Sequence, residues 1–232
     1  MKFTFQIEKI KKIQIDENNK YGDFNTVFFN KDVLPEEFNM TKKYVAGVDI
    51  HTRKIFIYNK QTNDIVDFGY FMESDIEYDI YRLMSLHSCQ LILNDEKQTL
   101  CAAMRCLNSV SFFNLKLELQ KTIVIGDKLN FPKPHPVAVS FPDEKIYFVG
   151  SCATPDYVYC LYYGIKYEDY VPDVKIFVFN WEGEHITTIQ TNGNIFRITA
   201  DKENKYLLGL LSRNNWTTTD IVKIPLEGVL KK

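Results

Sequence analysis

The sequence lacks any long apolar segment. No run of apolar residues approaches the roughly 18 residues that a membrane-spanning helix needs, so we expect no direct membrane span. The first residues, MKFTFQIEKIKKIQID, alternate in polarity and carry charges throughout, and so lack the continuous apolar core of a secretory signal peptide. We expect either a cytoplasmic protein or a targeting segment that lies outside this chain.

The sequence also lacks an excess of charge of either sign. The net charge is −2 and the isoelectric point is about 6.1. A chain with this balance has no electrostatic field that would attract nucleic acid, so we expect no nucleic-acid partner. One basic cluster, Lys9, Lys11 and Lys12, stands among isoleucines, and we interpret it as the charged face of a strand.

Cysteine and histidine are few, and their spacing fits neither a disulfide framework nor a metal site. The five cysteines are odd in number, and most lie in apolar runs where a free thiol behaves as a small buried hydrophobe. No two of the four histidines stand at the four-residue spacing of a helical metal site. Nucleophile-elbow, metalloprotease, P-loop and dinucleotide motifs are missing as well. The sequence therefore predicts no cofactor and disfavours an enzyme without deciding the matter.

What the sequence does contain is an internal repeat. At four places an apolar run meets an aspartate, a short polar stretch with a basic residue and a second apolar run: Asp49, Asp95, Asp143 and Asp201. They recur at intervals of roughly 46 to 58 residues, near the repeat length of about 40–50 residues in β-propeller blades. Because aspartate favours tight turns, each unit predicts strand, turn and strand.

A second set of similar strings, which we call the strand repeat, supports the same organisation. The strings KIFIYN (Lys54–Asn59), SFFN (Ser111–Asn114) and KIFVFN (Lys175–Asn180) each precede a turn and another short apolar strand. In the turn after Asn180, Gly183 can adopt the positive φ that a short hairpin loop needs. The string DIVKIPLEG near the C-terminus looks like the same strand again. The aspartate repeat and the strand repeat place the strand boundaries differently, so they leave open which strand is innermost.

We therefore predict an all-β fold, a β-propeller of four to five antiparallel four-stranded blades, with residues 1–232 as a single domain. β-branched and aromatic residues fill the apolar runs, which favours strands over helices. The last unit lacks an outer strand. We expect Lys2–Gln6 to supply it, because pairing a terminal strand with the last blade removes an open sheet edge.

At Val174–Thr191 and Ile195–Leu211 the residues resemble a known family. The strings VKIFVFNWEGEHITTIQT and IFRITADKENKYLLGLL are similar to the TolB-like six-bladed β-propeller proteins of Bacteroides-type bacteria. The resemblance is clearest over Tyr157–Leu211 and looser over the rest of the chain. It implies a binding or scaffolding role and a cell-envelope location, and it leaves open whether the chain is a shorter propeller or part of an incomplete six-bladed one. Six full blades usually need more chain than is present here.

The four repeat aspartates are weak candidates for a metal site. If Asp49, Asp95, Asp143 and Asp201 occupy equivalent points of successive blades, they form an acidic ring on one face, and such a ring could hold calcium. The alternative, which we favour, is that each aspartate caps its own turn.

The tyrosine-rich segment Asp156–Asp173 is the candidate binding site. Tyr163 to Pro172 combines acidic and aromatic residues in a predicted loop, and exposed tyrosines offer flat apolar area with a polar tip. We name Tyr163, Tyr167 and Tyr170 as candidate contacts to a partner, with the last two as the pair expected to be exposed. The alternative is that the rings pack between blades.

Three functions follow from these observations. The leading one is a non-catalytic propeller domain that binds a protein or glycan partner through loops on one face. The alternative is a propeller-type hydrolase or lactonase with an acidic, calcium-binding central channel. The third is a structural unit whose open blade edge pairs with another chain.

Overall fold

A computed structural model describes residues 9–12, 25–28, 35–49, 51–67, 76–78, 86–132, 145–166, 173–213 and 218–230 of the 232-residue chain. The regular structure in these residues is almost entirely β-strand, which confirms the predicted all-β class. Asp143, Tyr167, Tyr170 and Lys2–Gln6 lie outside the described residues.

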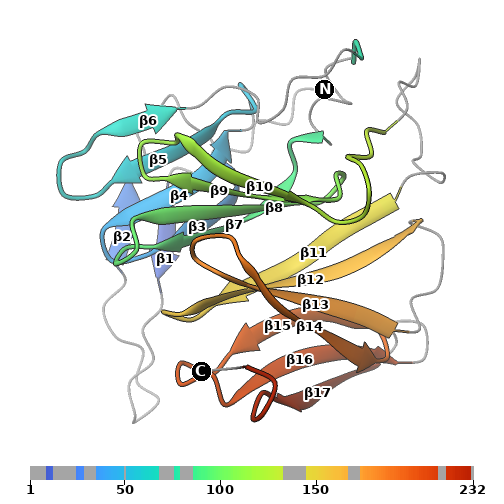
Figure 1. Cartoon of the computed structure of the whole chain (residues 1–232). Helices are drawn as coiled ribbons and strands as arrows, with labels where there is room; N and C mark the ends of the chain where they lie inside the picture. The colour runs from blue at the N-terminus through green and yellow to red at the C-terminus, as the bar shows by residue number, and fades with distance from the viewer. Residues whose placement is uncertain are drawn as a thin grey trace, which may run out of the picture.

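Four antiparallel sheets follow one another along the chain, and each is a meander whose strands pair in sequence order (Figure 1). We call these sheets blades 1 to 4. Blade 1 consists of β3 (Pro35–Met40), β4 (Tyr44–Asp49), β5 (Ile55–Asn59) and β6 (Ile65–Asp67). Blade 2 consists of β7 (Cys89–Asn94), β8 (Thr99–Met104), β9 (Ser109–Asn114) and β10 (Leu119–Val124).

The two C-terminal blades complete the series. Blade 3 consists of β11 (Lys145–Ala153), β12 (Tyr157–Lys166), β13 (Asp173–Asn180) and β14 (His185–Asn192). Blade 4 has three strands in the described part of the chain: β15 (Ile195–Ala200), β16 (Tyr206–Arg213) and β17 (Thr218–Pro225). A separate two-stranded sheet is formed by β1 (Lys9–Lys12) and β2 (Asn25–Phe28). The predicted succession of blades is thus confirmed.

The first strand of each blade is the innermost one. Strands β3, β7, β11 and β15 lie beside one another in succession, whereas the outer strands do not approach the next blade in this way. Side chains bridge these inner strands: the Asn39 Oδ1 on β3 accepts a bond from the Leu93 N–H on β7 at 3.2 Å. The Arg197 guanidinium on β15 donates to the Val149 carbonyl on β11 at 2.9 Å. This arrangement shows which strand is innermost, which the aspartate repeat and the strand repeat left open.

The strand repeat marks equivalent strands, and the aspartate repeat does not. KIFIYN, SFFN and KIFVFN belong to β5, β9 and β13, and DIVKIPLEG begins within β17, so all four mark the third strand of a blade. In contrast, Asp49 is the last residue of β4, the second strand of its blade, whereas Asp95 and Asp201 follow the first strands β7 and β15. The predicted equivalence of these aspartates is therefore wrong. Every hairpin of a meander joins two apolar strands through a polar turn, so the pattern cannot tell one hairpin from the next.

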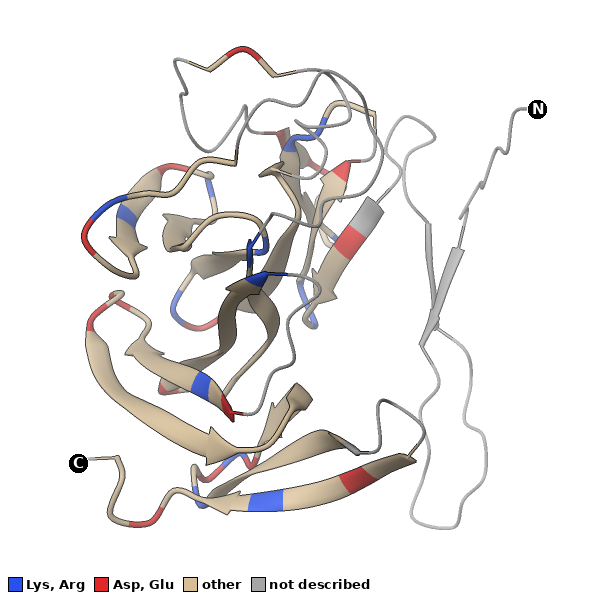
Figure 2. Cartoon of the chain, turned by 90° about the vertical axis from the view of Figure 1, so that its right-hand side faces the viewer, with Lys and Arg blue, Asp and Glu red and all other residues tan. Residues whose placement is uncertain are grey.

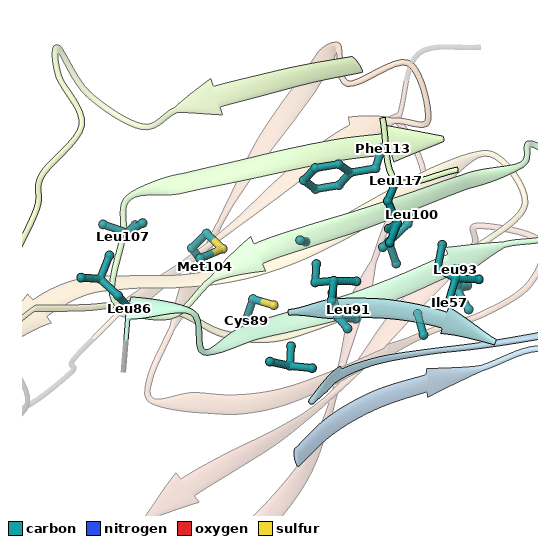
Figure 3. Packing of buried hydrophobic residues seen from close by; sticks show 14 residues of the cluster. Ile57, Leu86, Cys89, Leu91, Leu93, Leu100, Met104, Leu107, Phe113 and Leu117 are labelled. Carbon is teal, nitrogen blue, oxygen red and sulfur yellow. The ribbon is translucent and has the colours of Figure 1, made fainter. Parts of the chain in front are cut away.

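Three hydrophobic clusters fill the spaces between consecutive blades. The cluster between blades 1 and 2, shown in Figure 3, includes Ile57 from blade 1 and Leu91, Leu100 and Phe113 from blade 2. Comparable clusters lie between blades 2 and 3 and between blades 3 and 4. A central strand such as β8 is covered on both sides, which explains its continuous apolar sequence in place of an alternating one.

The cysteines follow the same logic. Cys89, Cys101 and Cys160 are buried in these clusters, as the sequence predicts, and all five cysteines are free thiols. Burial raises the pKa of Cys101, which also shares a hydrogen bond with Cys160 of the neighbouring blade. Burial likewise raises the pKa of Cys152 to about 12. These thiols are packing groups with little thiolate character at neutral pH.

Candidate functional site

The two ends of the blades differ in the connections that they carry. In an antiparallel meander, the turns between strands 1 and 2 and between strands 3 and 4 emerge at one end, which we call the turn end. The connections between strands 2 and 3, and those from one blade to the next, emerge at the opposite end, which we call the loop end. Residues 68–88, 125–144 and 167–172 all belong to loop-end connections, because they join strands whose paired ends lie there.

At the turn end, one asparagine design recurs between strands 3 and 4. The Asn180 Oδ1 accepts the Glu184 N–H at 2.7 Å, and the Asn114 Oδ1 accepts the Glu118 N–H at 3.0 Å. The fourth residue of each turn has positive φ: 73° at Gly183 and 60° at Leu117. The positive φ predicted for Gly183 is confirmed. The recurring asparagine explains why the strand repeat marked equivalent strands.

The turns between strands 1 and 2 share a second design in blades 1 and 3. In blade 3 the Thr154 N–H donates to the Tyr157 carbonyl at 2.9 Å, and the Tyr157 N–H donates to the Thr154 Oγ1 at 3.1 Å. Thr41 and Tyr44 make the same two bonds in blade 1, at 2.9 and 3.1 Å. A threonine hydroxyl that accepts a backbone N–H closes such a turn without glycine.

These first turns are also linked from blade to blade. The Thr41 hydroxyl of blade 1 donates to the carboxylate of Asp95 in blade 2. The Asn94 side-chain amide of blade 2 approaches the Pro155 carbonyl of blade 3 at 3.5 Å. The Asn204 side-chain amide of blade 4 donates to the Asp156 carboxylate of blade 3 at 3.0 Å. The turn end is therefore a series of short, mutually bonded turns, which suits a scaffold rather than an adaptable binding surface.

The described repeat aspartates do not form a ring. At the loop end, the buried Asp49 carboxylate accepts the N–H of Thr52 at 2.8 Å and its hydroxyl at 2.6 Å. Asp95 and Asp201 lie at the opposite end, where the Asp201 carboxylate accepts the Glu203 N–H of its own turn at 3.2 Å. Within the described ranges, no three carboxylate, histidine or cysteine side chains are grouped so that they could hold a metal ion. Asp49 therefore lies at the opposite end of the blades from Asp95 and Asp201, and these three residues do not share the one face that an acidic ring requires.

A buried polar group that the sequence did not single out lies where blades 1 and 2 meet. Arg53, in the turn between β4 and β5, and His87, just before β7, are 3% and 4% exposed. Burial, and then the charge of Arg53, lower the pKa of His87 to about 4, so the imidazole is neutral at pH 7. In the sequence, only the position of Arg53 four residues after Asp49 hinted at this buried group. Because a charged residue in a turn is ordinarily exposed, the spacing alone did not predict burial.

Tyr163 lies near the loop end in a structural contact. Its hydroxyl donates to the Asn194 Oδ1 at 2.8 Å and to the Ile195 carbonyl at 3.0 Å. Its ring packs against the cluster between blades 3 and 4, and burial raises its pKa to about 12. Tyr163 therefore stabilises the connection between these two blades through hydrogen bonds and packing. The chain continues from Tyr163 through Lys166 into residues 167–172, which contain Tyr167 and Tyr170.

Charged residues of both signs are interspersed along the turns and strands that the structure describes (Figure 2). Lys97 and Glu182, for example, form an exposed ion pair between turns of blades 2 and 3 at 3.8 Å. No helix in the residues that the structure describes has the length and apolarity needed to cross a membrane.

Comparison with solved structures agrees with this architecture. The WD40 repeats of RRP9 match with a TM-score of 0.53 at 11% identity, over 94% of this chain and 64% of that one. The chain is a β-propeller. A chain of the nidogen/laminin complex matches with a TM-score of 0.53 at 12% identity, over 92% of this chain and 74% of that one. Hydrazine synthase of Kuenenia stuttgartiensis matches at 0.52 and 10% identity, over 97% and 58%.

At these identities the likeness concerns the fold alone. The propeller spans less than two thirds of the hydrazine synthase and RRP9 chains that it matches. No family model matches the sequence, and no curated protein matches it significantly.

Proposed function

We propose that this propeller is a non-catalytic binding module that engages a protein or glycan partner through its loop end. The observation that carries the proposal is the contrast between the two ends. The turn end consists of short turns bonded to one another, whereas the long connections, residues 68–88 and 125–144, emerge at the loop end. Binding residues are found disproportionately on loops that a rigid scaffold positions.

The tyrosine-rich connection supplies the chemistry of contact. Tyr167 and Tyr170 flank Glu168 and Asp169 within residues 167–172, between β12 and β13. A phenol ring brings a large apolar contact area and a hydrogen-bonding tip at low conformational cost, which suits both peptide docking and sugar stacking. Tyr163, held by Asn194 and Ile195, anchors the strand from which this connection leaves.

A protein partner is the better supported of the two classes. One of the matched propellers was solved in a nidogen/laminin complex, so a propeller of similar shape takes part in a protein–protein assembly. The neighbouring acidic residues, Glu168 and Asp169, favour a partner surface with basic side chains at its rim. Membership of the TolB-like family and the extent of the single domain over residues 1–232 remain part of this proposal.

The experiment compares paired variants of the full chain. Tyr167→Ala with Tyr170→Ala should reduce affinity for a protein or glycan ligand more than tenfold, because truncating interface aromatics typically costs about 2 kcal/mol or more. The thermal midpoint should change by less than about 2 °C, since loop substitutions away from a core are nearly neutral. The matched control, Lys116→Ala with Lys202→Ala, changes two exposed residues of the turn end and should leave affinity unchanged.

Ligands are screened on a glycan array and by affinity capture followed by titration of each purified candidate. Equal loss of affinity in the tyrosine and lysine variants would place the contact surface elsewhere. A large fall in the thermal midpoint of the tyrosine variant would mean that its rings belong to the core.

A further inference from the structure

The turn between β8 and β9, residues 105–108, joins neighbouring parts of the loop end. The Arg105 N–H donates to the Ser88 carbonyl at 2.9 Å, and the Arg105 carbonyl accepts the Tyr147 N–H at 2.8 Å. Ser88 ends the connection between blades 1 and 2, and Tyr147 lies on β11, the innermost strand of blade 3. One turn of blade 2 therefore fixes both the chain that enters its own blade and the first strand of the next.

Asn108 is the buried end of this turn, and its side chain holds the connection that follows blade 2. Asn108 is 1% exposed. Its Nδ2 donates to the Ile125 carbonyl at 2.7 Å and to the Lys128 carbonyl at 2.9 Å, and its Oδ1 accepts the Asn130 N–H at 2.8 Å. The Asn108 carbonyl also accepts the Ile125 N–H at 2.7 Å. Both donors of the amide are used, so these partners fix its orientation.

The same connection is tied to its neighbours on both sides. The Tyr78 hydroxyl, from the connection between blades 1 and 2, donates to the Pro132 carbonyl at 2.8 Å. Phe131 packs with Tyr78 against the cluster between blades 1 and 2. On the other side, the Asn130 side chain hydrogen-bonds the hydroxyl of Tyr147 in blade 3. The two long loop-end connections are thus linked to each other and to the next blade.

We propose that Asn108, aided by Tyr78, positions residues 125–132 as a rigid strap, which gives this part of the loop end one conformation before any partner binds. Asp127 and Lys128 are exposed on the strap. Side chains on a fixed backbone lose less conformational entropy on binding than those on a backbone that must first be ordered. The part that the strap plays in binding rests on the proposed function, whereas its rigidity does not.

Loss of the Asn108 side chain should open the strap unevenly. The Asn130 N–H and two backbone carbonyls would lose their partner at once, and shielded backbone groups require a partner. The Ile125 N–H would keep its bond, because that bond goes to the backbone carbonyl of residue 108. The effect should therefore be largest at Asn130 and smaller at Ile125.

Hydrogen exchange in the full chain, with no ligand added, tests this positioning role. In Asn108→Ala, the Asn130 amide should exchange at least tenfold faster than in the original protein, and the Glu184 amide should change little. The matched control is Asn180→Ala, which removes the asparagine that holds Glu184 at the turn end. It should give the reverse pattern, with faster exchange at Glu184 and little change at Asn130, because each asparagine holds only its own segment.

Trypsin gives an independent measurement at Lys128. A protease cleaves a segment after it opens from the folded surface, so the rate follows the population of the open form. Asn108→Ala should raise the rate of cleavage after Lys128 at least tenfold. Tyr78→Phe keeps the ring and loses only the hydroxyl bond, and should raise the rate about threefold. Asn180→Ala should raise it less than twofold.

Three results would overturn the proposal. Equal acceleration at Asn130 and Glu184 in both alanine variants would mean a general loss of stability rather than positioning. An unchanged rate of cleavage in Asn108→Ala would mean that Asn108 does not hold the strap. An unchanged rate in Tyr78→Phe, which leaves the buried amide intact, would contradict the link between the two connections. None of these results bears on the proposed function, which the paired tyrosine variant tests separately.

Discussion

Blades 2 and 4 are built from the same meander, but they differ in what covers them. In β8 of blade 2, every residue from Leu100 to Met104 has an exposed fraction of 0%. In β16 of blade 4, Leu207 is fully buried while its neighbour Leu208 is 36% exposed. The two strands have similarly apolar sequences. The difference shows that a neighbouring blade, and not the strand itself, turns a second sheet face into core.

The largest effect should come from shortening the same side chain in the two blades. Leu100→Ala in blade 2 should lower the free energy of unfolding by about 3 kcal/mol, because it removes a fully buried side chain and leaves a cavity. Leu208→Ala in blade 4 should lower it by less than about 1 kcal/mol. Urea unfolding at pH 7 measures both. Equal losses would mean that blade 4 is covered in solution on the face that carries Leu208.

The pH dependence of stability should separate the two blades next. His87 precedes blade 2, whereas the corresponding position before blade 4 is Gly193. The pKa of His87 falls from 6.5 to about 4 on folding, so the unfolded chain binds more protons between these values. The contribution of His87 is therefore fully present above pH 6.5 and is lost as the pH falls toward 4.

Urea unfolding from pH 4 to pH 7 checks this expectation. The stability of His87→Gln should fall less steeply below pH 6.5 than that of the original protein. The control His51→Gln changes an exposed residue and should keep the original slope. An unchanged slope in His87→Gln would mean that folding does not lower the pKa of the imidazole.

A strained turn gives a smaller and less intuitive effect. Leu117 in blade 2 has a φ of 60°, which costs about 1–2 kcal/mol for a residue with a side chain, yet it is only 1% exposed. Leu117→Ala loses burial and keeps the strain, whereas Leu117→Gly loses burial and relieves it. Leu117→Gly should therefore be about 1 kcal/mol more stable than Leu117→Ala in urea unfolding. The reverse order would mean that the turn changes conformation in one variant.

The smallest effect concerns the bonds between turns. A double-mutant cycle with Thr41→Val and Asp95→Ala, across blades 1 and 2, should give a coupling energy of about 0.5–1.5 kcal/mol for a partly buried bond. The cycle with Asn204→Ala and Asp156→Ala, across blades 3 and 4, should give less than about 0.5 kcal/mol because that bond is exposed. Equal coupling would contradict the difference in burial between the two junctions.

The sequence predicted the fold from features that every blade repeats. Strand-forming runs and turn residues identified the meanders. Asn59, Asn114 and Asn180 marked equivalent third strands because the side-chain oxygen of each accepts a backbone N–H of the turn that follows its strand. The innermost strand could not be predicted, because strands covered on both faces lose the alternation that would reveal a face. This limitation also produced the wrong equivalence of Asp49 with Asp95 and Asp201.

The candidate site was less accessible to sequence reasoning. Contacts between blades, such as that between Thr41 and Asp95, join residues far apart in the chain and leave no local pattern. For Tyr163, the competing possibility of packing describes its observed contacts, which depend on Asn194 in the next blade. The roles of Tyr167 and Tyr170 remain predictions, because they lie outside the described residues.

Hydrogen exchange of backbone amides tests the central claim, that consecutive blades bury one another's faces, most directly. If the claim is correct, the amides of β8 and β12 exchange most slowly, at the rate set by global unfolding, and those of the outer strand β10 exchange faster. Equal protection across all four strands of blade 2, or slowest exchange in β10, would contradict it.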